Sequence, residues 1–209
     1  ETCYFEPGAG FLRPEECVAA QLDRARALGA VVRTGETLTS VAANGTSTTV
    51  VTAASTYSAA RVIVTAGPWV PQLLGGAYAS LLRVYPQTFY WFAPDHDADL
   101  APGRFPIFIW RYGSGEGDHF YGFPVVNAGV KVATEQFLRT ANPDIPPEPP
   151  SPADAPAMHD AHVRGRLLGL GARCLGAMTC LYTVTPGFRF VIDRHPDWPQ
   201  VLVASPCSG

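Results

Sequence analysis

Apolar positions first recur along the chain with the period of a helix. Residues 14–28 (PEECVAAQLDRARAL) place Val18, Leu22 and Ala25 on one face at helical spacing. A proline opens the segment and two glutamates follow it, whereas two arginines lie near its end, as the helix dipole favours. Gly29 comes next, and glycine commonly ends helices. The pattern predicts one helix over residues 14–28.

Three short apolar runs after this helix indicate strands. Residues 30–34 and 47–53 have the pattern of a strand and its hairpin partner, with the turn at 43–47 (ANGTS) between them. Residues 60–67 (ARVIVTAG) are almost continuously apolar, which is typical of a strand that is covered on both faces. Residues 1–75 therefore predict a mixed α/β arrangement.

The next region is rich in aromatic residues. Glycine, proline and aspartate interrupt it, so it divides into short strands of an antiparallel or mixed sheet with one covered face. The predicted strands are residues 83–94, 105–113, 118–125 and 129–137.

Proline changes the pattern in the last third of the chain. Residues 141–157 hold seven prolines, which exclude a regular helix or a central strand and predict an extended loop. Residues 158–176 have a helix-like pattern that glycines interrupt. Three further strands are predicted at residues 177–185, 188–193 and 200–205.

Composition limits the class of protein. Hydrophobic residues make up 47% and charged residues 16% of the 209 positions, which suits a globular chain with a core. The net charge of -3 gives no broad basic surface, so we expect no nucleic-acid partner. No apolar run reaches the ~20 residues of a membrane span, and no leader sequence is visible at the start. We therefore expect no membrane association and a cytoplasmic location.

The five cysteines bear on metal binding and redox state. Their spacing is irregular and contains no Cys-x-x-Cys pair, so we expect no metal site and reduced, intracellular thiols. Cys180 lies inside an apolar, strand-like run, where a free cysteine is commonly an inert apolar side chain. The residue pattern alone leaves open whether Cys180 is inert or carries chemistry.

Three stretches resemble the monomeric sarcosine oxidase and N-methyltryptophan oxidase family, which are flavoenzymes of the D-amino-acid-oxidase type. Residues 180–209 contain a Cys-x-Tyr-Thr, Phe-x-Ile-Asp, His-Pro and Cys-Ser-Gly series. Residues 120–136 contain Tyr-Gly-Phe-Pro followed by Gly-x-Lys. Residues 10–32 and 62–74 are similar to two further segments, in the same order. The resemblance thus covers nearly the whole chain.

The resemblance implies a mixed α/β (α+β) fold in two parts. Residues 10–76 and 177–209 would belong to a Rossmann-like FAD-binding domain, and residues 1–9 and 77–176 to a substrate domain with a mixed, largely antiparallel sheet. The family's Gly-x-Gly-x-x-Gly turn, which places the FAD pyrophosphate at a helix N-terminus, does not occur in this sequence. We therefore expect an interior segment of a longer, monomeric enzyme.

Two residues are implied to act directly at the flavin. The cysteine of the Cys-x-Tyr-Thr series, here Cys180, would be bonded through sulfur to the flavin, a reaction that needs a thiolate. The lysine of the Gly-x-Lys series, here Lys131, would lie above the ring and stabilise negative charge on reduced oxygen. The alternative for Lys131 is an exposed strand residue, because Val130 and Val132 flank it with a period of two.

Further positions are implied to face the substrate. Tyr121 and Tyr182 match two active-site tyrosines, although aromatic residues of a half-buried strand are more commonly structural. Glu135 stands where the family carries a histidine that contacts the substrate. An acid there would pair with an ammonium group and repel a carboxylate, which argues against sarcosine itself.

Four more residues match flavin-contacting turns of the family. Gly67 ends the predicted strand at 60–67 and Trp69 follows it, and Ser208 and Gly209 match the start of a C-terminal loop. Glycine lets backbone approach a ring closely, but an ordinary turn would carry the same residue.

The resemblance implies FAD-dependent oxidation of the C–N bond of a secondary amine or N-methyl amino acid, with oxygen as acceptor, giving an imine and hydrogen peroxide. Two other functions are compatible with the residues. The chain could be a non-catalytic binding or structural segment without flavin, or a cysteine hydrolase that uses Cys180 and a histidine such as His195. A hydrolase normally places its nucleophile at a sharp turn, which the run around Cys180 does not provide.

Overall fold

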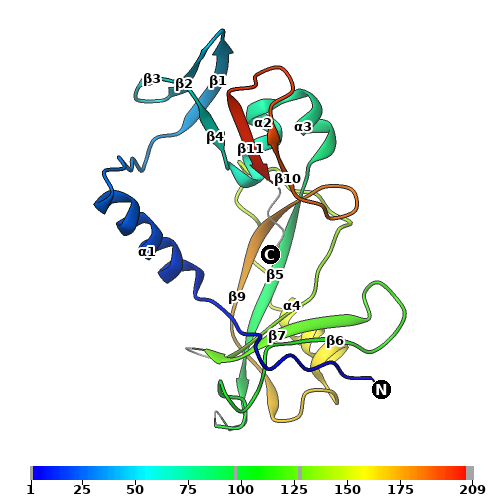
Figure 1. The fold of residues 1–209 in the computed structure, drawn as a ribbon. Helices are drawn as coiled ribbons and strands as arrows, with labels where there is room; N and C mark the ends of the chain where they lie inside the picture. The colour runs from blue at the N-terminus through cyan, green and yellow to red at the C-terminus, as the bar shows by residue number, and fades with distance from the viewer. Residues whose placement is uncertain (1, 97, 127–128, 206–209) are drawn as a thin grey trace.

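The computed structural model describes residues 2–96, 98–126 and 129–205. Three sheets and a few short helices make up this part of the chain, and one longer helix, α1, lies to one side of them (Figure 1). The mixed α/β class with largely antiparallel strands, which the sequence predicts, is confirmed.

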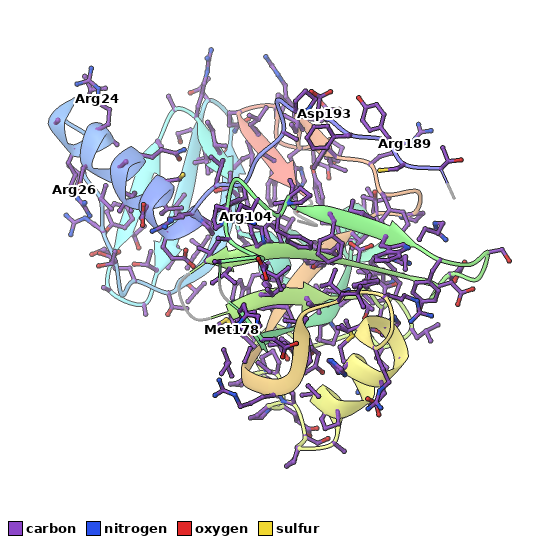
Figure 2. All side chains as sticks on the ribbon, turned by 90° about the horizontal axis from the view of Figure 1, so that it is seen from below. Arg24, Arg26, Arg104, Met178, Arg189 and Asp193 are labelled. Atoms are coloured by element: carbon purple, nitrogen blue, oxygen red, sulfur yellow. The ribbon has the colours of Figure 1, made fainter. Side chains whose placement is uncertain are left out.

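Helix α1 (Pro14–Ala27) matches the predicted segment closely. Its first turn carries proline and two glutamates, and its last turn carries Arg24 and Arg26, which project from the helix (Figure 2). Within α1, all of which the structure describes, no side chain is buried. The helix therefore forms through local preferences, and its apolar stripe carries no buried side chain.

A three-stranded antiparallel sheet follows, with strands β1 (Leu38–Asn44), β2 (Ser47–Thr52) and β3 (Thr56–Ala59). Gly45 has φ 59° in the predicted turn, a conformation that favours glycine. The predicted strand at 30–34 is wrong, because these described residues form no strand and Val31 is 81% exposed. Strand β1 takes the pairing position beside β2 instead.

A second sheet has the order β10-β11-β4, formed by Val191–Arg194, Val201–Ser205 and Val62–Val64. Strands β11 and β4 are parallel. Val64 is buried, but Ile63 is 65% exposed, so the expectation that this strand is covered on both faces is wrong for the described chain. One face packs on α2 (Val70–Leu74) and α3 (Gly76–Leu81), through the residues Val64, Val70, Tyr78, Leu82, Val201 and Val203.

The third and largest sheet contains the predicted aromatic strands. Its order is β6-β7-β8-β5-β9 and all neighbours are antiparallel. The strands are β5 (Arg83–Pro94), β6 (Phe108–Arg111), β7 (His119–Val126), β8 (Gly129–Ala133) and β9 (Leu170–Val184).

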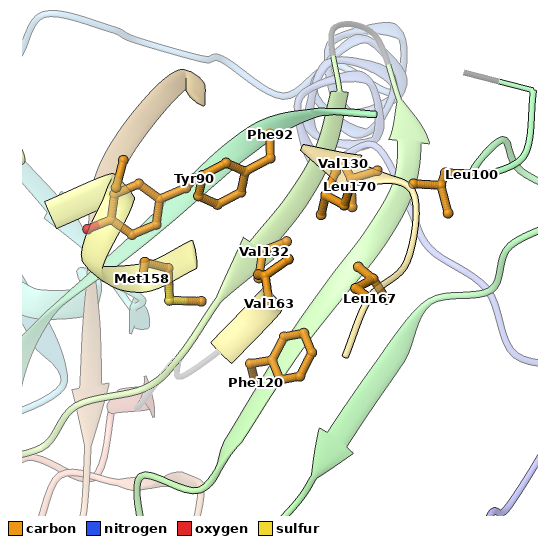
Figure 3. Packing of buried hydrophobic residues seen from close by; sticks show 11 residues of the cluster. Tyr90, Phe92, Leu100, Phe120, Val130, Val132, Met158, Val163, Leu167 and Leu170 are labelled. Atoms are coloured by element: carbon orange, nitrogen blue, oxygen red, sulfur yellow. The ribbon is translucent and has the colours of Figure 1, made fainter. Parts of the chain in front are cut away.

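One face of this sheet forms the main core. Phe92, Phe120, Val130 and Val132 are all fully buried there (Figure 3). The short helix α4 (Asp154–Met158) and the π-helical turn η2 (His159–Val163) cover them with Met158 and Val163. The prediction of a sheet with one well-covered face is therefore confirmed.

The helix predicted at 158–176 is wrong over most of its length. Helical structure ends at Val163, and Gly165 and Gly169 then take φ values of 74° and 78° in turns. Leu170 begins β9, because its apolar side chain enters the core beside β5. The loop predicted at 141–157 is confirmed up to Ala153, after which α4 begins.

The strand predicted at 188–193 begins later, at Val191. The reason is a turn in which the Thr185 hydroxyl donates to the Arg189 carbonyl oxygen at 2.7 Å and accepts from the Arg189 amide at 2.9 Å. Phe188, inside this turn, has φ 57°, which no strand residue adopts.

Two hydrophobic clusters are separate in the described chain. One lies under the five-stranded sheet, and the other lies between the β10-β11-β4 sheet and the helices α2 and α3. Strand β9 runs without interruption through residue 177, where the sequence places a domain boundary. The division into two domains stays a prediction.

We predict that Gly122→Ala, in β7, destabilises the protein. A Cβ at this position would lie 2.5 Å from the Lys131 carbonyl oxygen and 2.7 Å from the Phe108 ring, so backbone or core must shift. Overpacking of this kind costs about 1–3 kcal/mol, measured as a lower free energy of unfolding in urea. Gly117→Ala is the matched control, because nothing lies within 4 Å of a Cβ there. Equal losses in both variants would contradict the packing argument.

Candidate functional site

The face of the five-stranded sheet opposite the main core gathers four of the nine site residues implied by the resemblance. Residues that are paired across antiparallel strands point their side chains to the same face. Lys131 pairs with Trp91 and with Phe123. Cys180 pairs with Gln87 on the same central strand, β5. We call this surface the site face, and its side chains are those of Tyr85, Gln87, Phe89, Trp91, His119, Tyr121, Phe123, Lys131, Met178, Cys180 and Tyr182.

Lys131 is half-buried at the centre of the site face. Its Nζ lies 4.1 Å from the centroid of the Phe89 ring and 5.1 Å from that of Phe123. Such contacts offset part of the cost of burying an ammonium group. Burial lowers the pKa of Lys131, and negative charge at Cys180 and Glu15 opposes that shift. Lys131 is therefore not the freely exposed strand residue that was the alternative interpretation of its position between Val130 and Val132.

Cys180 lies half-buried on β9 within electrostatic reach of Lys131. Burial raises the pKa of the Cys180 thiol, and the positive charge of Lys131 opposes the rise. The two groups thus influence each other's protonation across β5. All four cysteines that the structure describes are free.

Tyr121 and Tyr182 form a hydrogen-bonded pair on the site face. Burial raises the pKa of Tyr121 well above its usual range, and the hydrogen bond with Tyr182 and the charges of Glu135 and Cys180 add to this. Tyr121 therefore keeps its proton and serves as a neutral hydrogen-bonding group. Tyr85 lies opposite Tyr182 on β5, so aromatic side chains continue toward that end of the face.

Glu135 follows β8 and faces a histidine that sequence reasoning missed. The Oε2 atom of Glu135 lies 3.9 Å from Nε2 of His119. Nδ1 of His119 lies 2.8 Å from the Glu116 carbonyl oxygen. The signal that could have found His119 is its spacing, since it precedes Tyr121 by two residues and a strand places such residues on one face.

Gly67 and Trp69 lie in a different element, the 3-10 turn η1 (Gly67–Trp69), which contacts β9. Gly67 has φ 51° and open space where a side chain would be. The Trp69 indole donates to Oδ1 of Asp144 at 2.9 Å, which ties this turn to the proline-rich loop. Ser208 and Gly209 lie outside the described residues.

A cavity of about 430 Å³ lies on the other side of β5, between that strand and α4. Tyr90, Met158 and His162 line it from the core side, and Gln87 of the site face also contributes to its lining. In the described part of the chain, no group of three or more His, Cys, Asp or Glu side chains could hold a metal ion.

His195, the histidine considered for a hydrolase, is buried in the second hydrophobic cluster. Its ring stacks on Trp198 at 4.3 Å and contacts Tyr78 at 5.5 Å between ring centroids. Its Nδ1 accepts a hydrogen bond from the Asp197 amide at 3.2 Å. These contacts give His195 a structural role in a β10–β11 turn.

Comparison with known proteins places these features in a family. The family described as FAD dependent oxidoreductase matches residues 1–209. A monomeric sarcosine oxidase from Streptomyces avermitilis is 35% identical over 216 residues, which cover 100% of this chain and 55% of that protein. An N-methyl-L-tryptophan oxidase from Salmonella typhi is 29% identical over 98% of this chain and 54% of its own length. The chain spans about half the length of the curated relatives that it matches.

Solved structures share the fold. NikD, described as an unusual amino acid oxidase essential for nikkomycin biosynthesis, superposes with a TM-score of 0.71 at 19% identity. The match covers 91% of this chain and 51% of NikD. Glycine oxidase from Geobacillus kaustophilus gives a TM-score of 0.61 at 18% identity, over 89% of this chain and 46% of that enzyme.

Every helix among the described residues is too short or too polar to span a membrane. The resemblance drawn from residues 10–32, 62–74, 120–136 and 180–209 is confirmed, because the family match extends over the whole chain and is accompanied by a relative of 35% identity. The chain belongs to the FAD dependent oxidoreductase family.

Proposed function

We propose that this chain supplies the substrate side of an FAD-dependent oxidase that acts on the C–N bond of a secondary amine or N-methyl amino acid. Oxygen is the acceptor, and the products are an imine and hydrogen peroxide. The observation that carries the proposal is the convergence of Cys180, Lys131, Tyr121, Tyr182 and Glu135 on or beside one face of one sheet.

The site face has the chemistry that a flavin ring requires. It offers a half-buried thiol, a lysine ammonium within electrostatic reach of that thiol, and flat aromatic side chains. Phe89 and Trp91 contact each other edge to face at 5.1 Å and form part of this wall. When bound, the flavin supplies the two-electron chemistry that no protein side chain provides.

Cys180 is proposed as the covalent anchor of FAD. Attachment needs the thiolate, which burial disfavours and the positive charge of Lys131 favours. Gly67 and Trp69 are proposed to contact FAD from η1, and Ser208 and Gly209 from the segment beyond the described residues. In this proposal residues 10–76 and 177–209 belong to the FAD-binding domain, and residues 1–9 and 77–176 to the substrate domain.

Lys131 is proposed to hold a fixed positive charge where negative charge develops on oxygen. A charge in a partly buried, apolar setting acts more strongly than one in water. The rings of Phe89 and Phe123 hold the ammonium in place, so little reorganisation is needed during the reaction.

Tyr121 and Tyr182 are proposed to orient the substrate. Because Tyr121 keeps its proton, it can donate a hydrogen bond to the substrate while Tyr182 orients its hydroxyl. Glu135 is proposed to accept from the substrate amine, and it disfavours a small substrate whose carboxylate would lie nearby. We expect a monomeric, cytoplasmic enzyme.

We predict that Cys180→Ser in the full-length enzyme keeps the fold but leaves FAD without its covalent bond. Flavin absorbance should then move to the supernatant when the protein is precipitated with acid, whereas it stays with the wild-type pellet. Cys174→Ser is the matched control on the same strand, where the Cys174 thiol donates a hydrogen bond to the Gly176 carbonyl oxygen at 3.2 Å. Mass spectrometry that locates flavin on any peptide other than the one carrying residue 180 would rule out this anchor.

We predict that Lys131→Met in the full-length enzyme slows reoxidation by oxygen by about 100-fold, because a preorganised charge is lost from the developing anion. Stopped-flow mixing of the reduced enzyme with oxygen measures this step apart from substrate oxidation. Arg173→Met removes an exposed cation from β9 and should leave the rate unchanged. A Lys131 variant that reoxidises at the wild-type rate would remove this residue from the oxygen reaction.

A further inference from the structure

The chain leaves the five-stranded sheet at Ala133, and Glu135 lies just beyond that point. Ala133 is the last residue of β8 that pairs with β5 or with β7. The chain returns to β5 where the Ala141 amide donates to the Val84 carbonyl oxygen at 2.8 Å. Glu135 therefore lies in a described segment, residues 134–140, that strand pairing does not hold.

The side chain of Gln87 holds this segment against β5. Its Nε2 donates to the Gln136 carbonyl oxygen at 2.7 Å, and its Oε1 accepts from the Gln136 amide at 2.9 Å. One carboxamide thus makes the pair of bonds that a neighbouring strand makes with a residue of a regular ladder. Gln87 is 2% exposed, so water hardly competes for these bonds, and losing them leaves polar groups without partners.

The side chain of Gln136 completes the attachment from the other direction. Its Nε2 donates to the carbonyl oxygens of Pro86 and Arg139 at 2.7 and 3.1 Å. Its Oε1 accepts from the amides of Leu138 and Arg139 at 3.1 and 2.9 Å. We call the contacts made by Gln87 and Gln136 the glutamine clamp. The clamp ties β5 to the segment and also shapes the turn within it.

Glu135 lies between the glutamine clamp and β7. Its Oε2 atom lies 3.9 Å from Nε2 of His119 on β7, whereas the backbone of the next residue, Gln136, is bonded to Gln87 on β5. Phe137, on the far side of the clamp, packs edge to face on Tyr85 with 5.4 Å between ring centroids. The clamp therefore fixes the backbone from which the carboxylate extends over the site face.

We propose that Gln87 is a positioning residue, which keeps the Glu135 carboxylate where the substrate amine binds without touching the substrate itself. The proposal rests on the proposed function, in which Glu135 accepts a hydrogen bond from that amine. Gln87 also pairs with Cys180 across β5 and β9. One buried side chain thus lies between the proposed flavin anchor and the segment proposed to meet the substrate.

The experiment replaces Gln87 in the full-length holoenzyme. Methionine has a similar length and volume but can neither donate nor accept as a carboxamide does. Gln87→Met should raise KM for sarcosine or N-methyl-L-tryptophan about tenfold, because a displaced carboxylate meets the amine poorly. Flavin content and the rate of reoxidation by oxygen should stay at the wild-type level.

Two further variants serve as control and as second test. Gln200→Met is the matched control, because Gln200 also donates to backbone carbonyl oxygens, those of Gly45 and Ser47, but away from the site face. Gln87→Asn keeps a carboxamide that is one methylene too short to reach both groups of Gln136. It should raise KM in the same direction, and it decides the matter if Gln87→Met yields no holoenzyme.

A double variant tests whether Gln87 acts through Glu135. Glu135→Ala removes the carboxylate, so adding Gln87→Met to it should raise KM no further. A second tenfold rise in the double variant would overturn the proposal, and so would an unchanged KM in both Gln87 variants or an equal rise in Gln200→Met. A kcat that falls in proportion to flavin content, with KM unchanged, would show a merely structural residue and overturn it too.

Hydrogen exchange in the full-length protein tests the glutamine clamp without any substrate. The Gln136 amide should exchange about tenfold faster in Gln87→Met, whereas the Val132 amide inside β8 should exchange at the wild-type rate. Unchanged exchange at Gln136 would overturn the clamp and the positioning role with it. A flavin-loaded enzyme that oxidises neither sarcosine nor N-methyl-L-tryptophan would instead refute the proposed function, whatever the exchange result.

Discussion

Strand β5 pairs with β8 along one edge and with β9 along the other, and this double pairing brings Lys131 and Cys180 to the same face. Lys131 and Met178 are 47 positions apart along the chain, and through this pairing they become neighbours of Trp91 and Phe89, respectively. The same strand sends Tyr90 and Phe92 into the main core. Because side chains alternate with a period of two, the core that fixes β5 also fixes the site face.

The site face combines groups whose charged forms are disfavoured by burial. Burial lowers the pKa of Lys131 and raises those of Cys180 and Tyr121, so each group is pushed toward its neutral form. Lys131 and Cys180 oppose this effect in each other, whereas the charge of Glu135 adds to it at Tyr121. The arrangement therefore separates a charge-bearing part, around Lys131 and Cys180, from a neutral hydrogen-bonding part around the two tyrosines.

Sequence patterns predicted the fold best where local preference and packing agree. The aromatic strands satisfy both and are confirmed, whereas the helix beginning at Pro14 is confirmed on local preference alone. The segment 30–34 has strand-like composition, but only a partner strand could make it one, and β1 takes that place. The helix-like pattern after Met158 fails at Gly165 and Gly169, because turns there lead Leu170 into the core beside β5. Non-local pairing decides such segments, and one sequence does not reveal it.

The site residues also divide into those that a sequence motif identifies and those that only non-local contacts reveal. Cys180, Lys131 and Tyr121 belong to short motifs, so the resemblance found them, and the sheet register places them together. His119 belongs to no motif, and its contact depends on the turn before β7. There Oδ2 of Asp118 accepts a hydrogen bond from the Gly115 amide at 2.8 Å, and the Asp118 amide donates back to the Gly115 carbonyl oxygen at 3.1 Å.

The turn at residues 113–118 has no space for side chains at two of its glycines. A Cβ at Gly113 or at Gly115 would lie within 3 Å of the Asp118 carboxylate, so these glycines let the loop close around it. The closed loop brings the Glu116 carbonyl back to His119, and the ring then faces Glu135 from the neighbouring part of the sheet. The side chain that faces the Glu135 carboxylate is thus oriented by a loop on another strand. The surroundings of Glu135 therefore depend on the loop at residues 113–118 as well as on the strand that Glu135 follows.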